Sequence, residues 1–203
     1  PLIYAYKATD IAITGEGTID GNGSNETWWK WCGAPKFGWK EGVGSQKIGR
    51  PMLQRWSEDG VPVNKRKMGD GYFMRPQLIN FNQCDGILIE GVTLLRSPFW
   101  VIHPLLSQNI TVKRVHIAND GPNGDGCDPE SCNKVLIEDC FFHTGDDCIA
   151  IKSGRNADGR LWNRPSENMI IRGCTMADGH GGVVVGSEIT GGCRNVFVEN
   201  CNM

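Results

Sequence analysis

Residues 133–142 read NKVLIEDCFF, and variants of this pattern return along much of the chain. Gap-free copies begin at Asp85, Gln108, Asn133, Glu167 and Arg194. A looser copy covers Thr9–Thr14. In each copy apolar residues alternate with polar ones, a small or polar position interrupts, and a second alternating stretch follows. Alternation with a period of two is typical of β-strands and not of helices.

The gap-free copies start 23, 25, 34 and 27 residues apart. Repeats of this length that consist of short strands indicate a solenoid. We therefore expect an all-β fold, a right-handed parallel β-helix, in which equivalent residues of successive rungs stack about 4.8 Å apart. A leucine-rich repeat is the competing solenoid, but the copies lack its leucine-rich consensus.

The cysteines fit a stacked core. The chain holds nine cysteines, an odd number, and no pair has the two-residue spacing of a zinc knuckle, so we expect no metal. Cys140, Cys174 and Cys201 each occupy the eighth position of a copy, where Val92 and Val115 stand in two others. Because a buried free cysteine behaves as a small apolar side chain, these positions predict an internal ladder.

We expect one β-helix domain over residues 1–203, which we interpret as a fragment of a longer chain, with an irregular insertion at residues 20–80. The insertion is rich in tryptophan, and its aromatic rings suit either packing onto the coil or contact with sugar rings. A shorter insertion is expected at residues 155–165, where the repeat spacing is longest.

Composition narrows the possible partners. The formal net charge is -2, which gives no sign of nucleic-acid binding, and no apolar run approaches the roughly 18 residues that a membrane span needs. We therefore expect neither nucleic acid nor membrane as a partner.

Four polar residues share phases of the repeat. Asp146 stands thirteen residues after the start of its copy, and His180 stands thirteen after the start of the next. Aligning the preceding rung places Asp125 over Asp147, with Cys127, Ile149 and Val183 in one inward column and Pro129, Ile151 and Val185 in another. The register therefore predicts that Asp125, Asp146, Asp147 and His180 converge, although Asp beside Gly is also common in ordinary turns.

Strict alternation would send Asp146 and Asp147 to opposite sides of a strand, so both can face one groove only if the chain bends there. Gly145 makes such a bend available. Carboxylates held this close should raise at least one pKa, leaving a protonated acid beside ionised bases, as glycoside hydrolysis requires.

Several motifs resemble those of glycoside hydrolase family 28, the polygalacturonases and their relatives. They are GEGTIDGNG (15–23) with WW (28–29), RP (75–76) with LINF (78–81), SPFWVIH (97–103), GDDC (145–148) and GHG (179–181). The resemblance implies a parallel β-helix and an inverting hydrolase that cleaves α-1,4-galacturonosidic bonds in pectin without a cofactor.

By that resemblance Asp146 would protonate the leaving oxygen, Asp125 and Asp147 would hold and deprotonate water, and His180 would support the acid or the substrate. Inversion places the two carboxyl groups about 6.5–9.5 Å apart, a separation we expect adjacent rungs to supply. Asn123, in a variant of the family's Asn-Thr-Asp motif, and Lys152, an expected outward-facing cation, are candidate substrate-binding residues.

Other functions remain open. An exo-acting polygalacturonase is favoured by the long insertion, and a rhamnogalacturonan hydrolase is its nearest alternative. A pectate lyase would use the same acids to hold calcium, and a pectin-binding solenoid would use the groove without turnover. The family's Arg-x-Lys motif, which grips the uronate carboxylate, is absent from these residues. The resemblance further implies a secreted or periplasmic protein, which we expect to be a monomer.

Overall fold

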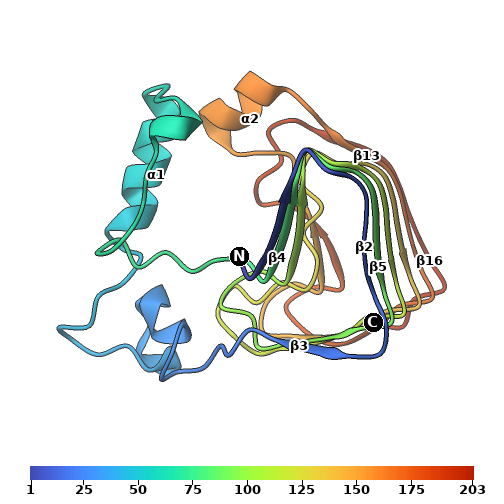
Figure 1. Cartoon of the computed structure of the whole chain (residues 1–203), viewed down its shortest axis with the longest axis horizontal. Coiled ribbons are helices and arrows are strands. Elements are labelled where there is room, and N and C mark those ends of the chain that lie inside the picture. Colours follow the sequence, from blue (N-terminus) through green and yellow to red (C-terminus); the bar gives the residue numbers. More distant parts are fainter.

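A computed structural model describes residues 1–203 as a parallel β-helix with two helices beside it (Figure 1). Each rung passes in turn through three parallel sheets, here called A, B and C. Sheet A contains β1 (Ile3–Tyr6), β4 (Ile79–Asn82), β7 (Ile102–Leu105), β12 (Ile149–Ile151) and β15 (Val183–Val185). On the fourth rung, single bridges at Cys127 and Glu130 continue sheet A in place of a strand.

Sheets B and C follow sheet A on each rung, although the last rung adds only a single bridge, at Asn202, to sheet C. Sheet B contains β2 (Thr9–Thr14), β5 (Asp85–Glu90), β8 (Gln108–Lys113), β10 (Asn133–Glu138), β13 (Ser166–Arg172) and β16 (Cys193–Glu199). Sheet C contains β3 (Thr18–Asp20), β6 (Thr93–Leu95), β9 (His116–Asn119), β11 (Phe141–Thr144) and β14 (Thr175–Asp178). The prediction of an all-β parallel solenoid is confirmed.

The pairing register is the one that the repeat predicts. Asp85 pairs with Gln108, Gln108 with Asn133, Asn133 with Glu167, and Glu167 with Arg194. On sheet A, Cys127 pairs with Ile149 and Ile149 with Val183, as expected. The pair of Ile151 with Val185 is also present, but Val185 is 56% exposed because it lies on the last rung of the chain.

A left-handed residue shapes the start of every sheet B repeat. The second position of each copy has φ between 52° and 73°, a range that glycine, asparagine and aspartate tolerate best. The residues are Asp10, Gly86, Asn109, Lys134, Asn168 and Asn195. Asn195 and Asn168 also donate to the side-chain oxygen of the asparagine on the preceding rung, at 3.1 and 2.8 Å. This position therefore both bends the chain and links the rungs.

The interior is a set of apolar ladders. Ile89, Ile137 and Ile171 are fully buried in sheet B, and Leu94 and Ile117 in sheet C. All nine cysteines are free thiols. In the predicted ladder Cys140 and Cys174 are buried while Cys201, on the last rung, is partly exposed, so the cysteines pack as apolar side chains.

The segment between β3 and β4 leaves the coil. It contains α1 (Gly49–Glu58) and three short 3-10 helices, η1 (Trp29–Cys32), η2 (Pro35–Phe37) and η3 (Val63–Lys65). A second helix, α2 (Asn156–Trp162), extends from the corner between sheets A and B and packs against α1 (Figure 1). Both segments are among the predicted insertions, but their helices were not predicted, because the repeat pattern gives no information about residues outside it.

Contacts of the insertion explain much of its aromatic content. Trp31 packs edge-to-face against Trp28 and Phe73, and the Trp29 indole donates to the Ser97 carbonyl at 3.0 Å. At the far end, the Arg66 guanidinium pairs with Asp158 of α2 at 2.5 and 2.9 Å. The insertion is thus fastened to the coil at two separate places. Neither helix is long and apolar enough to span a membrane.

Two neighbouring residues of β13 test the assigned interior. Ile171 is fully buried whereas Ile170 is 40% exposed on the opposite face. We expect Ile171→Ala to lower the free energy of unfolding by about 2–5 kcal/mol, because it removes transfer free energy and leaves a cavity. Ile170→Ala should cost about 1 kcal/mol or less. Urea denaturation would measure both, and equal losses would contradict the assignment of faces.

Candidate active site

The predicted acidic cluster forms at the corner where the chain passes from sheet C to sheet A. Successive turns at this corner cover residues 120–126, 145–148 and 179–182. Backbone hydrogen bonds stack these turns. The amide of Gly126 donates to the carbonyl oxygen of Asp147 at 3.0 Å, and the amide of His180 donates to the carbonyl oxygen of Asp146 at 3.0 Å. The long insertion leaves the coil at this same corner, after β3.

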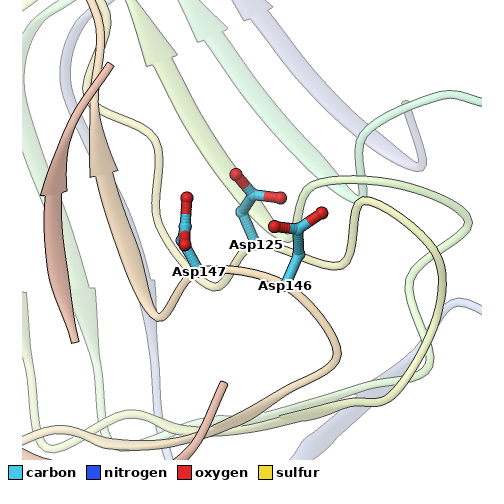
Figure 2. Close-up of side chains that lie close together, drawn as sticks. All are labelled: Asp125, Asp146 and Asp147. Carbon is cyan, nitrogen blue, oxygen red and sulfur yellow. The ribbon is translucent and has the colours of Figure 1, made fainter. Parts of the chain in front are cut away.

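The three carboxylates converge as predicted. One oxygen from each of Asp125, Asp146 and Asp147 lies within 4.8 Å of the other two. Figure 2 shows the three side chains projecting to the same side of the chain, although Asp146 and Asp147 are sequence neighbours. His180 lies beside the cluster, with Nδ1 3.1 Å from an oxygen of Asp146 and its side chain 73% exposed.

Gly145 contributes differently from the expectation. Its backbone is not left-handed, but a Cβ atom there would lie 2.5 Å from the carbonyl oxygen of Asp120, so only glycine lets the two turns approach. The bend itself is held by the Thr144 hydroxyl, which donates to the carbonyl of Asp146 at 2.9 Å. Gly179, on the next rung, is the residue with a positive φ, at 145°.

Burial and repulsion change the acidity of the cluster. Burial raises the pKa of Asp125 to about 6, the negative charge of Asp146 adds to the rise, and Lys152 opposes it. Burial and the charge of Asp146 also raise the pKa of Asp147. The expectation that crowding raises at least one carboxyl pKa is therefore confirmed, and Asp125 is the most deeply buried of the three, at 4% exposure.

One oxygen of each carboxyl lies within 4.8 Å of an oxygen of the other two. This proximity follows from the register, because Asp125 and Asp147 lie on adjacent rungs, which parallel pairing spaces about 4.8 Å apart. The roughly 6.5–9.5 Å typical of inverting enzymes separates the acid and base carboxyl groups as wholes and not their nearest oxygens. The expected separation of acid and base therefore stays a prediction.

Lys152 does not face an open groove. It points out of the coil, as strand alternation predicts, but its side chain is only 5% exposed because other parts of the chain cover it. Its ammonium lies 3.2 Å from Glu188, 3.6 Å from Asp128 and 3.9 Å from Asp125, and 4.8 Å above the Trp100 ring. Lys152 thus faces outward as predicted, but the expectation that it lies open on the groove is corrected.

Asn123 is held by a residue of the insertion. Its side-chain oxygen accepts a hydrogen bond from Arg75 at 2.7 Å, so that oxygen is already engaged within the protein. Arg75 is 5% exposed and also donates to the carbonyls of Pro98 at 3.1 Å and Pro122 at 2.5 Å. The insertion thereby holds the turn that carries Asp125.

A second contact supports this turn. A Cβ atom on Gly121 would lie 2.4 Å from the indole nitrogen of Trp29, so the tryptophan presses directly on the backbone of the turn. Arg75 and Trp29 were not predicted as parts of the site, because their contacts with the turn span 47 or more residues and leave no local pattern. It also missed Asp128 and Glu188, although Asp128 stands between the inward residues Cys127 and Pro129 and so had to face outward.

The family model described as "Glycosyl hydrolases family 28" matches residues 54–203. The chain belongs to this family. A probable polygalacturonase of Vitis vinifera is 34% identical over 98% of this chain and 34% of its own length. The exo-poly-alpha-D-galacturonosidase of Dickeya chrysanthemi is 26% identical over 94% of this chain and 32% of its own length.

A solved structure gives a similar result. The hyperthermoactive exopolygalacturonase of Thermotoga maritima is 47% identical, with a TM-score of 0.98 over 99% of this chain and 46% of that one. The family 28 chain described here thus spans about a third of the length of these two curated relatives and under half of this structure.

Replacing Arg75 tests its support of the site. Arg75→Met leaves the carbonyls of Pro98 and Pro122 and the side chain of Asn123 without a donor, so we expect the free energy of unfolding to fall by about 1–3 kcal/mol. Arg96→Met is the matched control, because Arg96 pairs with Asp20 on the surface and should matter far less. Urea denaturation of both variants would decide, and equal effects would contradict the role of Arg75.

Proposed function

We propose that the protein hydrolyses α-1,4-galacturonosidic bonds in polygalacturonate. The observation that carries this proposal is the convergence of three carboxylates and a histidine at one corner of a family 28 β-helix. Hydrolysis of a glycosidic bond needs one carboxylic acid to protonate the leaving oxygen and one carboxylate to act on the opposite side of the sugar. The cluster holds the residues for both tasks.

Asp146 is our candidate for the general acid. Its side chain is 25% exposed, against 6% for Asp125, so it can reach a glycosidic oxygen above the cluster. The imidazole of His180, 3.1 Å away, orients the Asp146 carboxyl and compensates its charge once the proton has been given up. A histidine in this position therefore supports the acid.

Asp125 and Asp147 are the candidates for the base. Because the Asp125 side chain is only 6% exposed, a water molecule can reach its carboxylate more easily than a sugar carbon can. This favours activation of water over direct attack by the carboxylate, and hence inversion. Asp147, in register with Asp125 on the next rung, supplies a second acceptor for the same water.

Exo action is part of the proposal. Two of the relatives are described as exo-acting, the enzyme of Dickeya chrysanthemi and the structure from Thermotoga maritima. The insertion supports the same choice, because it is anchored at the corner that carries the acids and contacts their turn through Arg75 and Trp29. We further propose that the protein is secreted, since its polymeric substrate lies outside the cell, and that it acts as a monomer.

The acid assignment predicts a large loss of activity. We expect Asp146→Asn to lower kcat on polygalacturonate by about 10²–10⁴-fold, because it removes the proton donor. The substitution should be made in the full-length natural protein. Asp178→Asn is the control, an exposed aspartate on the neighbouring strand β14 that lies outside the cluster. Release of reducing ends measures activity, and NMR of the first product would show whether the anomer is inverted.

The same assay separates the competing functions. A pectate lyase would release a product with an unsaturated bond that absorbs ultraviolet light, and its activity would fall on adding a chelator, because calcium would have to bridge the acids. Hydrolysis should show neither effect. Retained turnover in Asp146→Asn would refute the acid assignment, and binding without turnover by the wild type would refute the enzyme.

The base assignment predicts a particular pH profile. Asp125 must be ionised to accept a proton, and its pKa is raised to about 6. We expect kcat/KM to fall about tenfold per pH unit below this value, because the base is then protonated. Assays between pH 4 and 8 would show the limb, and a limb near the ordinary aspartate value of about 4 would contradict the assignment.

A further inference from the structure

Behind Asp125 lies a buried group of charges to which the reaction gives no role. Asp128, three residues farther along the chain, is 0% exposed on the outward side of sheet A. Lys152, 5% exposed, lies within 3.9 Å of the carboxyls of Asp125, Asp128 and Glu188. No bulk water reaches Asp128, so its protonation state has to be set by these neighbours.

Asp128 lacks the partners that an ionised carboxylate needs. Neither of its oxygens meets a hydrogen-bond donor from the rest of the protein, and Lys152 stays 3.6 Å away. The carboxyl of Asp125 lies beside the same ammonium, 3.9 Å from it. A hydrogen bond between the two carboxyl groups would give Asp128 a partner, and it requires a proton on one of them, because an ionised carboxylate is purely an acceptor.

The charges of the group indicate which carboxyl holds the proton. With all three carboxyls ionised, three negative charges would surround one ammonium in a region sealed from solvent, which is strongly unfavourable. Glu188 is satisfied as an anion, since it pairs with Lys152 at 3.2 Å and with Arg155 at 3.4 Å. The proton therefore belongs to the Asp125–Asp128 pair, and Asp128 is the more deeply buried member.

We propose that Asp128 is a neutral carboxylic acid that donates a hydrogen bond to Asp125, and that Lys152 is the counter-charge that keeps Asp125 ionised. Both are positioning residues, since they act through Asp125 and do not touch the substrate. The proposal rests on the assignment of Asp125 as the base in the proposed hydrolysis. It replaces substrate binding as the role of Lys152.

The electrostatic directions agree with this arrangement. Burial raises the pKa of Asp128 far above its ordinary value, and the charge of Asp125 raises it further. The hydrogen bond from Asp128 and the charge of Lys152 both lower the pKa of Asp125, against the stronger effect of burial. Burial also depresses the pKa of Lys152, but the surrounding carboxyls raise it by more, so the ammonium stays charged.

The remaining charged groups around the pair leave this conclusion intact. Asp146, Asp147 and His180 lie on the open side of Asp125, and of these Asp146 disfavours its ionisation. On sheet A, Glu130 is the bridge partner of Lys152 but forms its own pair with His103 at 2.8 Å. Lys152 is thus the one cation within 4 Å of Asp125.

Two variants test the proposal in opposite directions. Asp128→Asn keeps the shape, the neutrality and an N–H donor, so we expect kcat/KM within about threefold of wild type and an unchanged acid limb. Lys152→Met removes the counter-charge, so the limb should move upward by about one pH unit or more with KM little changed. Arg155→Met is the control, because it removes an exposed cation from the same Glu188 without touching Asp125.

Opposite outcomes would overturn the proposal. If Asp128 is an essential anion, Asp128→Asn will lose most activity or shift the limb to lower pH. If Lys152 binds substrate, Lys152→Met will raise KM and leave the limb in place. Because Lys152→Met is a buried substitution, thermal unfolding would check its fold, and Lys152→Gln and Asp128→Asn carry the test if it does not fold.

A measurement without turnover separates this proposal from the proposed function. Carbon-13 NMR of aspartate carboxyls follows the titration of Asp125 directly, with Asp125→Asn giving the assignment. We expect a midpoint near pH 6 in the wild type and a higher midpoint in Lys152→Met. A shifted midpoint in a protein that does not hydrolyse polygalacturonate would refute the function alone, and an unshifted midpoint in an active enzyme would refute the counter-charge alone.

Discussion

Parallel pairing between successive rungs, with equivalent residues in register, is the constraint on which the whole structure depends. Asp85, Gln108, Asn133, Glu167 and Arg194 follow one another down sheet B without a slip. A slip of one residue would turn every buried isoleucine outward, so the hydrophobic ladders fix the register firmly. The same register then applies at the corners, where no apolar ladder exists. The packing of the buried ladders therefore also fixes where the acidic residues at the corners lie.

The acidic site follows directly from that placement, which also makes ionisation of its carboxyls less favourable. The rung spacing holds the ionisable carboxyls of Asp125 and Asp147 close together. Burial and the charge of Asp146 raise the pKa of both. The protein offsets this with a buried ammonium, Lys152, and with an imidazole at the solvent side, His180. The cluster is thus asymmetric: its inner side is sealed and charge-balanced, whereas its outer side, at Asp146, is open. An acid and a base can be distinguished on this basis even though all three side chains are aspartates.

The sequence predicted those parts of the molecule that repeat. The strand register, the cysteine ladder and the convergence of Asp125, Asp146, Asp147 and His180 all follow from counting along equivalent positions. Features outside the repeat could not be obtained in this way. Residues far apart in the sequence form the packing of α1 on α2, the contact of Arg75 with Asn123, and the burial of Lys152 against Glu188 and Trp100. Alternation correctly sent Lys152 to the outer face, but only the fold shows that this face is covered. Gly145 was singled out for its flexibility, whereas its lack of a side chain beside Asp120 is what the structure uses.

In a coil of this kind each rung normally touches only its neighbours, so an end can fray without disturbing the middle. The contact of the insertion with α2 changes this, because Arg66 precedes the second rung and Asp158 belongs to the fifth. Arg66 and Asp158 are 92 residues apart along the chain. Because they pair, unfolding of the early rungs also removes a contact of a late rung. Loss of structure should therefore be cooperative from the second rung to the fifth, a range that includes the turns carrying Asp125, Asp146 and Asp147, and this protects the acids from local unfolding.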